Sequence, residues 1–409
     1  MTTKQTHAFA ATKTASTILA GRPDCPFMPV FGAPQVMFER GQGTQLWDVN
    51  GKRYLDFLCG IAVTSLGHSH PVIAAAIAHQ ANTLLHVSNF FANPVATQTA
   101  IMVDELVSSS SGLSSGAGQV FFCNSGAEAN EAGIKLARKF GGRGKHVVVS
   151  ALGSFHGRTL AALAATGQPE KHEPFAPMPE GFRHVVFNDI KSLETSLDNS
   201  VAAILLETVQ GEGGVIPASV EYLQAVRKIC TERGILMMID EVQTGFARTG
   251  KWFGFQHAEI EPDVVMLAKA MGNGMPIGAL WARKEIAAVF KPGDHGSTFS
   301  GTAIATAAAR ATIQLMLDMD APTVATLRGQ ELSEKLRSVN GVVEVRGRGL
   351  LLAAELRADL DAKSVATQLL EHGLVVNGVT SHALRFAPPL TVSSAEIDEA
   401  IAIIKQVLK

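Results

Sequence analysis

Short apolar runs alternate with helix-like stretches through the middle of the chain, from about residue 60 to about residue 310. Runs that are apolar throughout are typical of strands buried on both faces of a parallel sheet, because neither face alternates with polar residues. The regular return of strand and helix predicts an α/β fold in which helices cover both faces of a mostly parallel sheet. The clearest strand-like runs are Val120–Cys123, His146–Val149, Val201–Leu206, Ile235–Ile239 and Val264–Leu267.

The pattern changes on either side of this region. Gln45–Asp48 has the composition of a short strand, and after residue 310 longer amphipathic helices alternate with shorter strands. The last helix is the clearest, because Ser393 and Glu396 have capping-box spacing and apolar residues follow at helical intervals. We therefore expect two domains, the smaller one built from both termini: an N-terminal segment at 1–60, a large domain at 61–310 and a C-terminal part of the small domain at 311–409.

Composition limits the classes of function. The 409 residues are 46% hydrophobic and 18% charged, with a net charge of -2, so we expect a globular protein without a nucleic-acid or membrane-surface partner. No apolar run approaches the roughly 20 residues that span a bilayer. The scattered cysteines predict free thiols in a reducing compartment, and we expect a cytoplasmic protein. The first twenty residues are expected to form a loose arm, although their composition faintly resembles a transit peptide.

An acid and an amine follow two of the apolar runs. Asp240 comes after Ile235–Ile239, and Lys269 comes just after Val264–Leu267. The carboxyl edge of a parallel sheet is where ligands bind, and a desolvated lysine loses its charge readily and can act as a nucleophile. A cofactor with a cationic ring nitrogen and an aldehyde carbon, such as pyridoxal 5'-phosphate (PLP), would use both groups. The alternative is a structural ion pair between the two side chains.

The start of one predicted helix is suited to an anion. Ser125, Gly126 and Ala127 follow a strand-like run and precede a helical one. Their small side chains leave backbone N–H groups accessible, and the helix dipole favours a phosphate there. An ordinary N-cap made by Ser125 is the alternative. Ser297 and Thr298 offer hydroxyls for a second phosphate contact, with a helix cap again as the alternative.

Four further residues are candidates for the site. Phe155 could stack on a flat ring and Arg158 could bind a carboxylate through two hydrogen bonds, unless they are a core Phe and a solvated Arg. Glu212 lies among glycines after a strand, in a cleft or in a surface turn. Arg385 could bind a second carboxylate or lie at the surface. The pair His68 and His70 has no clustered third ligand, so no metal site is predicted.

Together, and in this order, these stretches resemble the class III aminotransferases, which have the fold of type I PLP enzymes. The resemblance runs from about Pro29 to the C-terminus. It is closest at Asp240–Gly245, which is followed by Arg248-Thr249-Gly250, and the interval from Asp240 to Lys269 also fits. Within the family the chain is most similar to members that act on N-acetylornithine, on the evidence of Gly60–Val63, Gly67-His68, His86–Asn89, Phe155–Thr159 and Thr166–Pro169.

The resemblance implies a reaction. The amino group of N2-acetyl-L-ornithine would pass to 2-oxoglutarate, giving N-acetyl-L-glutamate 5-semialdehyde and L-glutamate, a step of arginine biosynthesis. Another ω-amino donor, namely ornithine, succinylornithine or 4-aminobutyrate, is the nearest alternative. A PLP-dependent isomerase and a non-catalytic protein that keeps the fold are more distant ones.

The resemblance also assigns roles around the cofactor. Lys269 would hold PLP covalently, and Asp240 would pair with its ring nitrogen. Val242 and Phe155 would cover the two faces of the ring, while Gln243 would approach the ring hydroxyl.

For the phosphate, the resemblance implies the N–H groups of Gly126 and Ala127, next to Ser125. Thr298, with Ser297, would reach the phosphate or the substrate from the other subunit of a homodimer with shared active sites.

For the substrates, it implies that Arg158 binds the carboxylate of the acetylated amino acid and Arg385 the α-carboxylate of glutamate. Glu212 would pair with Arg385 until glutamate displaces it. Phe31 stands where the family often has Tyr, which favours an acylated donor. Other departures from the family pattern are Thr208, Asn273, Ser300 and Thr302.

Overall fold

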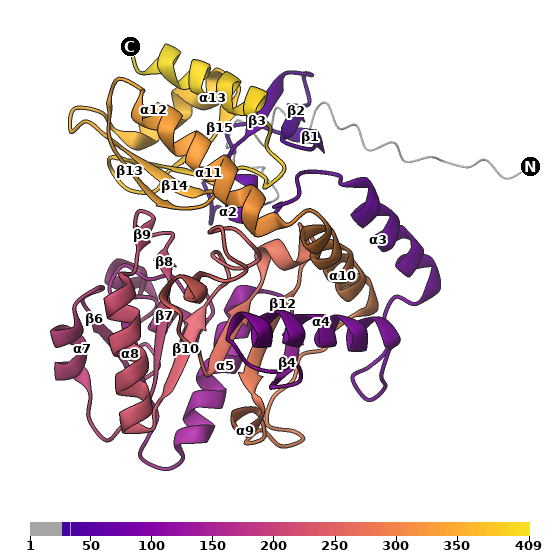
Figure 1. Cartoon of the computed structure of the whole chain (residues 1–409), viewed down its shortest axis with the longest axis vertical. Coiled ribbons are helices and arrows are strands. Elements are labelled where there is room, and N and C mark those ends of the chain that lie inside the picture. The colour runs from indigo at the N-terminus through magenta and orange to yellow at the C-terminus, as the bar shows by residue number, and fades with distance from the viewer. Residues whose placement is uncertain (1–26, 33) are drawn as a thin grey trace, which may run out of the picture.

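The computed structural model describes residues 27–32 and 34–409, and its centre is a seven-stranded sheet (Figure 1). All pairs among the five strands from β11 to β6 are parallel, whereas β12 runs antiparallel to both of its neighbours. The expected mostly parallel sheet is therefore confirmed. In spatial order the strands are β4 (Gly118–Cys123), β12 (Gly278–Arg283), β11 (Val264–Leu267), β10 (Leu236–Asp240), β7 (Val201–Glu207), β5 (Val147–Ala151) and β6 (Phe182–Val185).

Both faces of the sheet are buried. Successive side chains of a strand point to opposite faces, and Met238 and Ile239 of β10 accordingly belong to two different apolar clusters. Helix α5 (Gly126–Gly141) contributes to the cluster of Met238, and helix α8 (Val220–Arg233) to that of Ile239. This double burial is the reason why the strands are continuous apolar runs in the sequence.

All five of the runs singled out from the sequence are strands. Their bounds differ by a residue or two, since β5 begins at Val147 and β10 at Leu236. Two strands of the sheet, β6 and β12, were not among those runs. The sequence of β12, Gly-Ala-Leu-Trp-Ala-Arg, is buried almost throughout, but nothing in it indicates an antiparallel direction.

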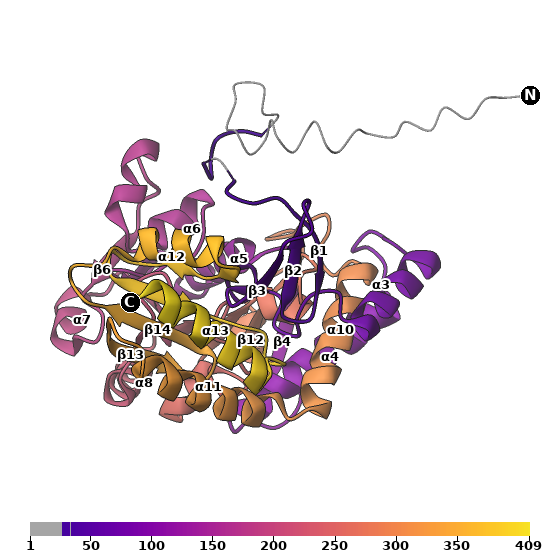
Figure 2. The same cartoon turned by 90° about the horizontal axis from the view of Figure 1, so that it is seen from above.

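Segments from the two ends of the chain share a second sheet. Its order is β1 (Phe38–Gln42), β2 (Gln45–Asp48), β3 (Arg53–Asp56) and β15 (Leu374–Val375), with β15 parallel to β3. A third sheet joins β13 (Val342–Arg348), β14 (Leu351–Leu356), β17 (Ala383–Phe386) and β16 (Asn377–Gly378). Figure 2 shows the C-terminal helices α12 (Ala362–Glu371) and α13 (Ser394–Val407) on the same side of the molecule as these strands.

The cap of the last helix is as expected. Ser393 Oγ accepts a hydrogen bond from Glu396 N at 3.2 Å, and Ser393 N donates to Glu396 Oε2 at 2.8 Å. The remaining α-helices of the described residues are α2 (Cys59–Ala62), α3 (Pro71–Thr83), α4 (Pro94–Ser110), α6 (Leu160–Ala165), α7 (Ile190–Ser196), α9 (Lys284–Ala287), α10 (Ala303–Asp318) and α11 (Ala321–Arg337).

The structure also bears on the expectations for the cysteines and for membrane spans. Cys59, Cys123 and Cys230 are buried free thiols, and burial raises the pKa of Cys123 and of Cys230 to about 12. Cys25 and the N-terminal arm lie outside the described residues. Among the helices that are described, none combines the length and the apolar character that a membrane span requires.

Helix α11 approaches the backbone closely at Gly329. A Cβ added there would lie 2.1 Å from the carbonyl oxygen of Gly349, which cannot move without distorting the chain. We predict that Gly329→Ala lowers the free energy of unfolding by about 1–3 kcal/mol, although alanine favours a helix. Gly133→Ala in α5 is the matched control, because its Cβ would meet the flexible Met266 side chain at 3.2 Å. Equal urea midpoints for the two variants would contradict the prediction.

Candidate active site

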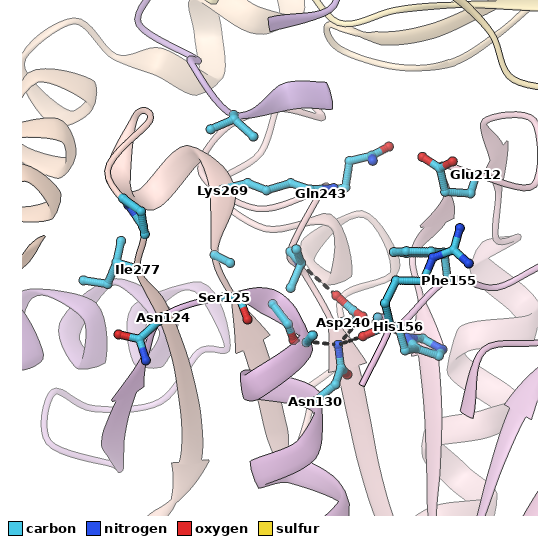
Figure 3. A pocket seen from close by; sticks show the side chains of 18 of the residues that line it. Asn124, Ser125, Asn130, Phe155, His156, Glu212, Asp240, Gln243, Lys269 and Ile277 are labelled. Carbon is cyan, nitrogen blue, oxygen red and sulfur yellow. Dashed lines mark hydrogen bonds and ion pairs between the residues drawn. The ribbon is translucent and has the colours of Figure 1, made fainter. Parts of the chain in front are cut away.

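A cavity of about 390 Å³ opens at the carboxyl ends of β7, β10 and β11 (Figure 3). Its lining comes from five stretches that are far apart in the sequence, together with Val63. Ten of the residues predicted from the sequence lie in this lining. They are Ser125, Gly126, Ala127, Phe155, Arg158, Glu212, Asp240, Val242, Gln243 and Lys269.

Lys269 begins a short turn one residue after the end of β11. Its backbone is left-handed, with φ of 46°, a conformation that is strained for any residue with a side chain. Burial lowers the pKa of its amine from 10.5 to about 8, and the positive charge of Arg385 acts in the same direction. The carboxylates of Glu212, Asp240 and Glu207 oppose this shift. The amine is therefore far easier to deprotonate than an exposed lysine.

Asp240 is held by three donors. Its Oδ2 accepts a hydrogen bond from Asn130 Nδ2 at 2.9 Å and lies 2.8 Å from His156 Nδ1, while its Oδ1 accepts from Val242 N at 3.0 Å (Figure 3). No ion pair between Asp240 and Lys269 occurs in the described part of the chain, so the structural ion pair considered from the sequence is wrong. The carboxylate is fixed in the cavity wall and remains available to a cationic ligand.

The first turn of α5 lies against the cavity. Ser125 Oγ accepts a hydrogen bond from Glu128 N at 3.2 Å, so the ordinary N-cap is present. This cap leaves the N–H groups of Gly126 and Ala127 without partners inside the helix, as first-turn groups are. The approach is tight, because a Cβ on Gly126 would lie 2.7 Å from Val242 Cγ1. Cap and anion site are therefore compatible.

Phe155 and Arg158 lie together at the cavity. Phe155 is half-buried, and the guanidinium carbon of Arg158 is 5.6 Å from the centre of its ring. The backbone N–H of Phe155 donates to Glu207 Oε2 at 3.1 Å, which fixes the backbone from which the ring projects. Phe155 is thus a wall of the cavity and not a core residue, while Arg158 is exposed on its outer side.

Glu212 and Arg385 form an ion pair beside Lys269. Glu212 Oε1 is 2.6 Å from Nη1 of Arg385, which is fully buried on β17, so neither is the surface residue that the sequence left open. Burial alone would raise the pKa of Glu212, but the charge of Arg385 and its hydrogen bond bring it below the ordinary value. Arg385 Nη1 also lies 3.4 Å from Gln243 Oε1, and Nη2 is buried with no partner among the described residues.

Four predicted residues are not part of this lining: Arg385, which contacts it through Glu212, and Phe31, Ser297 and Thr298. Phe31 is 98% exposed. Ser297 and Thr298 line a separate hollow, and Ser297 Oγ accepts from Asn124 Nδ2 at 3.0 Å. They do not cap the helix that follows, because α10 has Thr302 at its N-cap position.

Among the cavity residues that were given no role from the sequence, three bond Asp240 or Phe155: Asn130, His156 and Glu207. Glu207 follows the same rule as Asp240, since it ends β7 and is paired in register with Asp240. Burial, followed by the charge of Asp240, raises the pKa of Glu207 well above its ordinary value. Asn130 lies one helical turn after Gly126, a spacing that could have identified it. The contact of His156 depends on packing alone.

Comparison with known proteins agrees with this geometry. The family described as Aminotransferase class-III matches residues 30–408, and the chain belongs to this family. It is 46% identical to the acetylornithine aminotransferase of Caldanaerobacter subterraneus subsp. tengcongensis, over 93% of this chain and 96% of that protein.

Two solved structures show the same fold. N-acetylornithine aminotransferase from Stenotrophomonas maltophilia K279a has a TM-score of 0.79 and 33% identity, covering 91% of this chain and 95% of its own. Ornithine aminotransferase from Toxoplasma gondii ME49 has a TM-score of 0.87 and 32% identity, covering 93% and 91%.

The depressed pKa of Lys269 has a consequence for stability. Below pH 8 the folded protein holds a buried ammonium, whereas above pH 10.5 the amine is neutral in both the folded and the unfolded chain. We predict that Lys269→Met stabilises the cofactor-free protein by up to about 3 kcal/mol at pH 7, and that the gain shrinks as pH rises from 8 to 10.5.

Urea unfolding at several pH values measures this gain. Lys251→Met, at an exposed lysine, is the control and should show no comparable effect. A Lys269→Met gain that is absent at pH 7, or that stays constant with pH, would contradict the burial of the charge.

Proposed function

We propose that the protein catalyses PLP-dependent transfer of the terminal amino group of N2-acetyl-L-ornithine to 2-oxoglutarate. The products are N-acetyl-L-glutamate 5-semialdehyde and L-glutamate. The observation that carries this proposal is the meeting, in one cavity, of a readily deprotonated amine and a fixed carboxylate, beside a glutamate that is paired with a buried arginine. The relative and one of the solved structures named above are acetylornithine aminotransferases, which supports the choice of donor.

The residues of the cavity fit PLP. Asp240 would face the ring nitrogen, Val242 and Phe155 would flank the ring, and Gln243 would lie near its hydroxyl. The first turn of α5 offers free N–H groups to the phosphate. When bound, PLP supplies an aldehyde carbon that amines attack and a cationic ring that draws electrons from the carbon bearing that amine.

Lys269 has the properties of an attachment point and of a proton carrier. Its amine is neutral in a substantial fraction of molecules near pH 8, so it can attack the aldehyde carbon. As a free amine, Lys269 Nζ would accept a proton from the substrate carbon that bears the amino group and would later return it. Asp240, kept in position by Asn130 and His156, stabilises positive charge on the ring nitrogen.

Two carboxylate sites would let one cavity accept two substrates. Arg158 at the mouth would bind the carboxylate of the acetylated donor. While Glu212 neutralises Arg385, an α-carboxylate gains little from that arginine. Glutamate would displace Glu212 and use both the freed Nη1 and the unpartnered Nη2 of Arg385.

The proposal extends to the oligomeric state, the domains and the cellular location of the protein. The protein acts as a homodimer in which Ser297 and Thr298 of one subunit reach the cavity of the other, and Phe31 approaches the donor. Phe31 and Thr298 are exposed and Ser297 is half-buried, all outside the subunit's own cavity, which is compatible with this arrangement. The large domain spans 61–310, with the small domain built from both termini, and the protein works in the cytoplasm.

A different ω-amino donor is the second candidate, because the fold matches an ornithine aminotransferase with a TM-score of 0.87. We predict that N-acetylornithine converts the bound cofactor faster than ornithine, succinylornithine or 4-aminobutyrate, as followed by visible absorbance in single half-reactions. Lys269→Ala is the control and should lose multiple turnover. Faster reaction with another donor would replace the substrate, whereas no reaction with any donor would overturn transamination.

The ion pair between Glu212 and Arg385 gives a separate prediction. Glu212→Ala should raise kcat/KM for glutamate relative to that for N-acetylornithine by about tenfold, because a charge-assisted hydrogen bond no longer has to be broken. Glu212→Gln keeps the size of the side chain without its charge and should have a smaller effect. Steady-state kinetics with both donors measure the ratio, and an unchanged ratio in Glu212→Ala would remove Glu212 from this role.

A further inference from the structure

Asn273 joins the turn that carries Lys269 to a distant segment. The turn covers Lys269–Gly272, and Asn273 ends it in a left-handed conformation with φ of 45°. Its Oδ1 accepts a hydrogen bond from Leu66 N at 2.7 Å, and its Nδ2 donates to Gly67 O at 3.1 Å. Within the described residues, Leu66 N and Gly67 O have no hydrogen-bond partner other than this side chain. A single amide therefore clamps the two segments together.

The clamp closes one wall of the cavity. Val63 lines the cavity from the distant segment, and Gly274 and Met275 line it just beyond Asn273. The two segments also lie close together at Gly274, where an added Cβ would be 3.5 Å from Thr64 Cγ2. Separating them would admit water beside the amine of Lys269.

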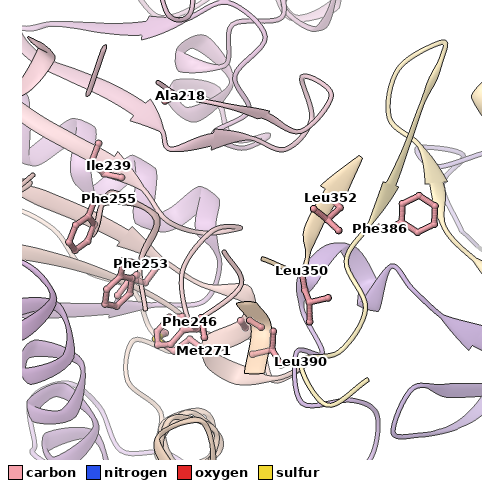
Figure 4. Packing of buried hydrophobic residues seen from close by; sticks show 14 of the residues in the cluster. Ala218, Ile239, Phe246, Phe253, Phe255, Met271, Leu350, Leu352, Phe386 and Leu390 are labelled. Carbon is pink, nitrogen blue, oxygen red and sulfur yellow. The ribbon is translucent and has the colours of Figure 1, made fainter. Parts of the chain in front are cut away.

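The joined segments are conformationally strained and need to be held. Cys59, Ile61 and Ala62, just before Val63, have φ of 54°, 67° and 60°, which is unfavourable for residues with a side chain. Lys269 itself has the left-handed backbone described above. The other side of the turn is anchored in the core, where Met271 is fully buried in the same cluster as Phe246, Leu350 and Leu390 (Figure 4).

We propose that Asn273 is a positioning residue for Lys269: its amide fixes the turn against residues 64–67 and keeps water away from the amine. As a statement about catalysis, this rests on the proposed transamination. Around the amine lie the carboxyl groups of Glu207, Glu212 and Asp240 and the guanidinium of Arg385. Removing the Asn273 side chain changes none of these groups, so a change in the titration midpoint of Lys269 reports hydration.

The test uses Asn273→Gly. Glycine accepts the left-handed backbone, so the substitution removes the two side-chain hydrogen bonds without adding strain. The chain offers a matched control in Asn188, which has φ of 61° and makes the same two bonds away from the cavity, accepting from Ser219 N at 2.9 Å and donating to Pro217 O at 3.1 Å. Asn188→Gly makes the same change of residue type elsewhere.

Two measurements are made on the full-length protein. In the cofactor-free protein, the pH dependence of reductive methylation of Lys269, followed by peptide mass spectrometry, gives the midpoint of its titration. We expect Asn273→Gly to move this midpoint up by about one pH unit, because hydration favours the ammonium, and Asn188→Gly to leave it unchanged. In the cofactor-loaded enzyme, kcat should fall about tenfold for Asn273→Gly with KM within threefold, and Asn188→Gly should match the wild type.

The outcomes separate the proposals. An unchanged midpoint in Asn273→Gly, or equal changes in both variants, would overturn the positioning role. A shifted midpoint with undiminished kcat would overturn its part in catalysis. If the wild type does not transaminate, the proposed function is refuted. A shifted midpoint in Asn273→Gly would still support the positioning of Lys269 by Asn273.

Discussion

Parallel pairing of β7, β10 and β11 is the constraint on which the site depends. Asp240 is paired in register with Glu207 on one side and with Met266 on the other, shortly before Lys269. Because parallel strands end at the same edge of the sheet, polar residues that follow them meet there without any further contact to guide them. The strands can be buried on both faces since their backbone groups bond one another. The cavity is thus a consequence of how the central sheet is paired.

Exclusion of water then gives the site its chemical character. An amine, three carboxyl groups and a guanidinium lie around one space, and burial makes their mutual effects larger than they would be in solvent. Burial and Arg385 push Lys269 toward the neutral form, while Glu207, Glu212 and Asp240 oppose them. The resulting pKa of about 8 makes the amine reactive and also makes the folded chain less stable than it could be. Reactivity and loss of stability have the same physical cause.

Much of the fold and part of the site could be predicted from local patterns. The five apolar runs became strands because burial on both faces leaves a continuous signature, and Ser393 with Glu396 marked the start of the last helix for an equally local reason. The direction of β12 could not be predicted, because an apolar run has no direction. Glu207 could have been identified by the rule that found Asp240. His156 could not have been, because its contact with Asp240 joins a loop to a strand.

By itself, the sequence determined the alternation of strand and helix, the polar residues at strand ends and the order of motifs typical of the family. These are properties of neighbouring residues, and hydrophobic periodicity records them directly. Only the tertiary structure decided that Asp240 bonds Asn130 and His156 in place of Lys269, and that Arg385 is buried against Glu212. It likewise left Phe31, Ser297 and Thr298 outside the cavity. Such contacts depend on distances of a few ångströms between elements far apart in the chain, and packing of the whole molecule sets those distances.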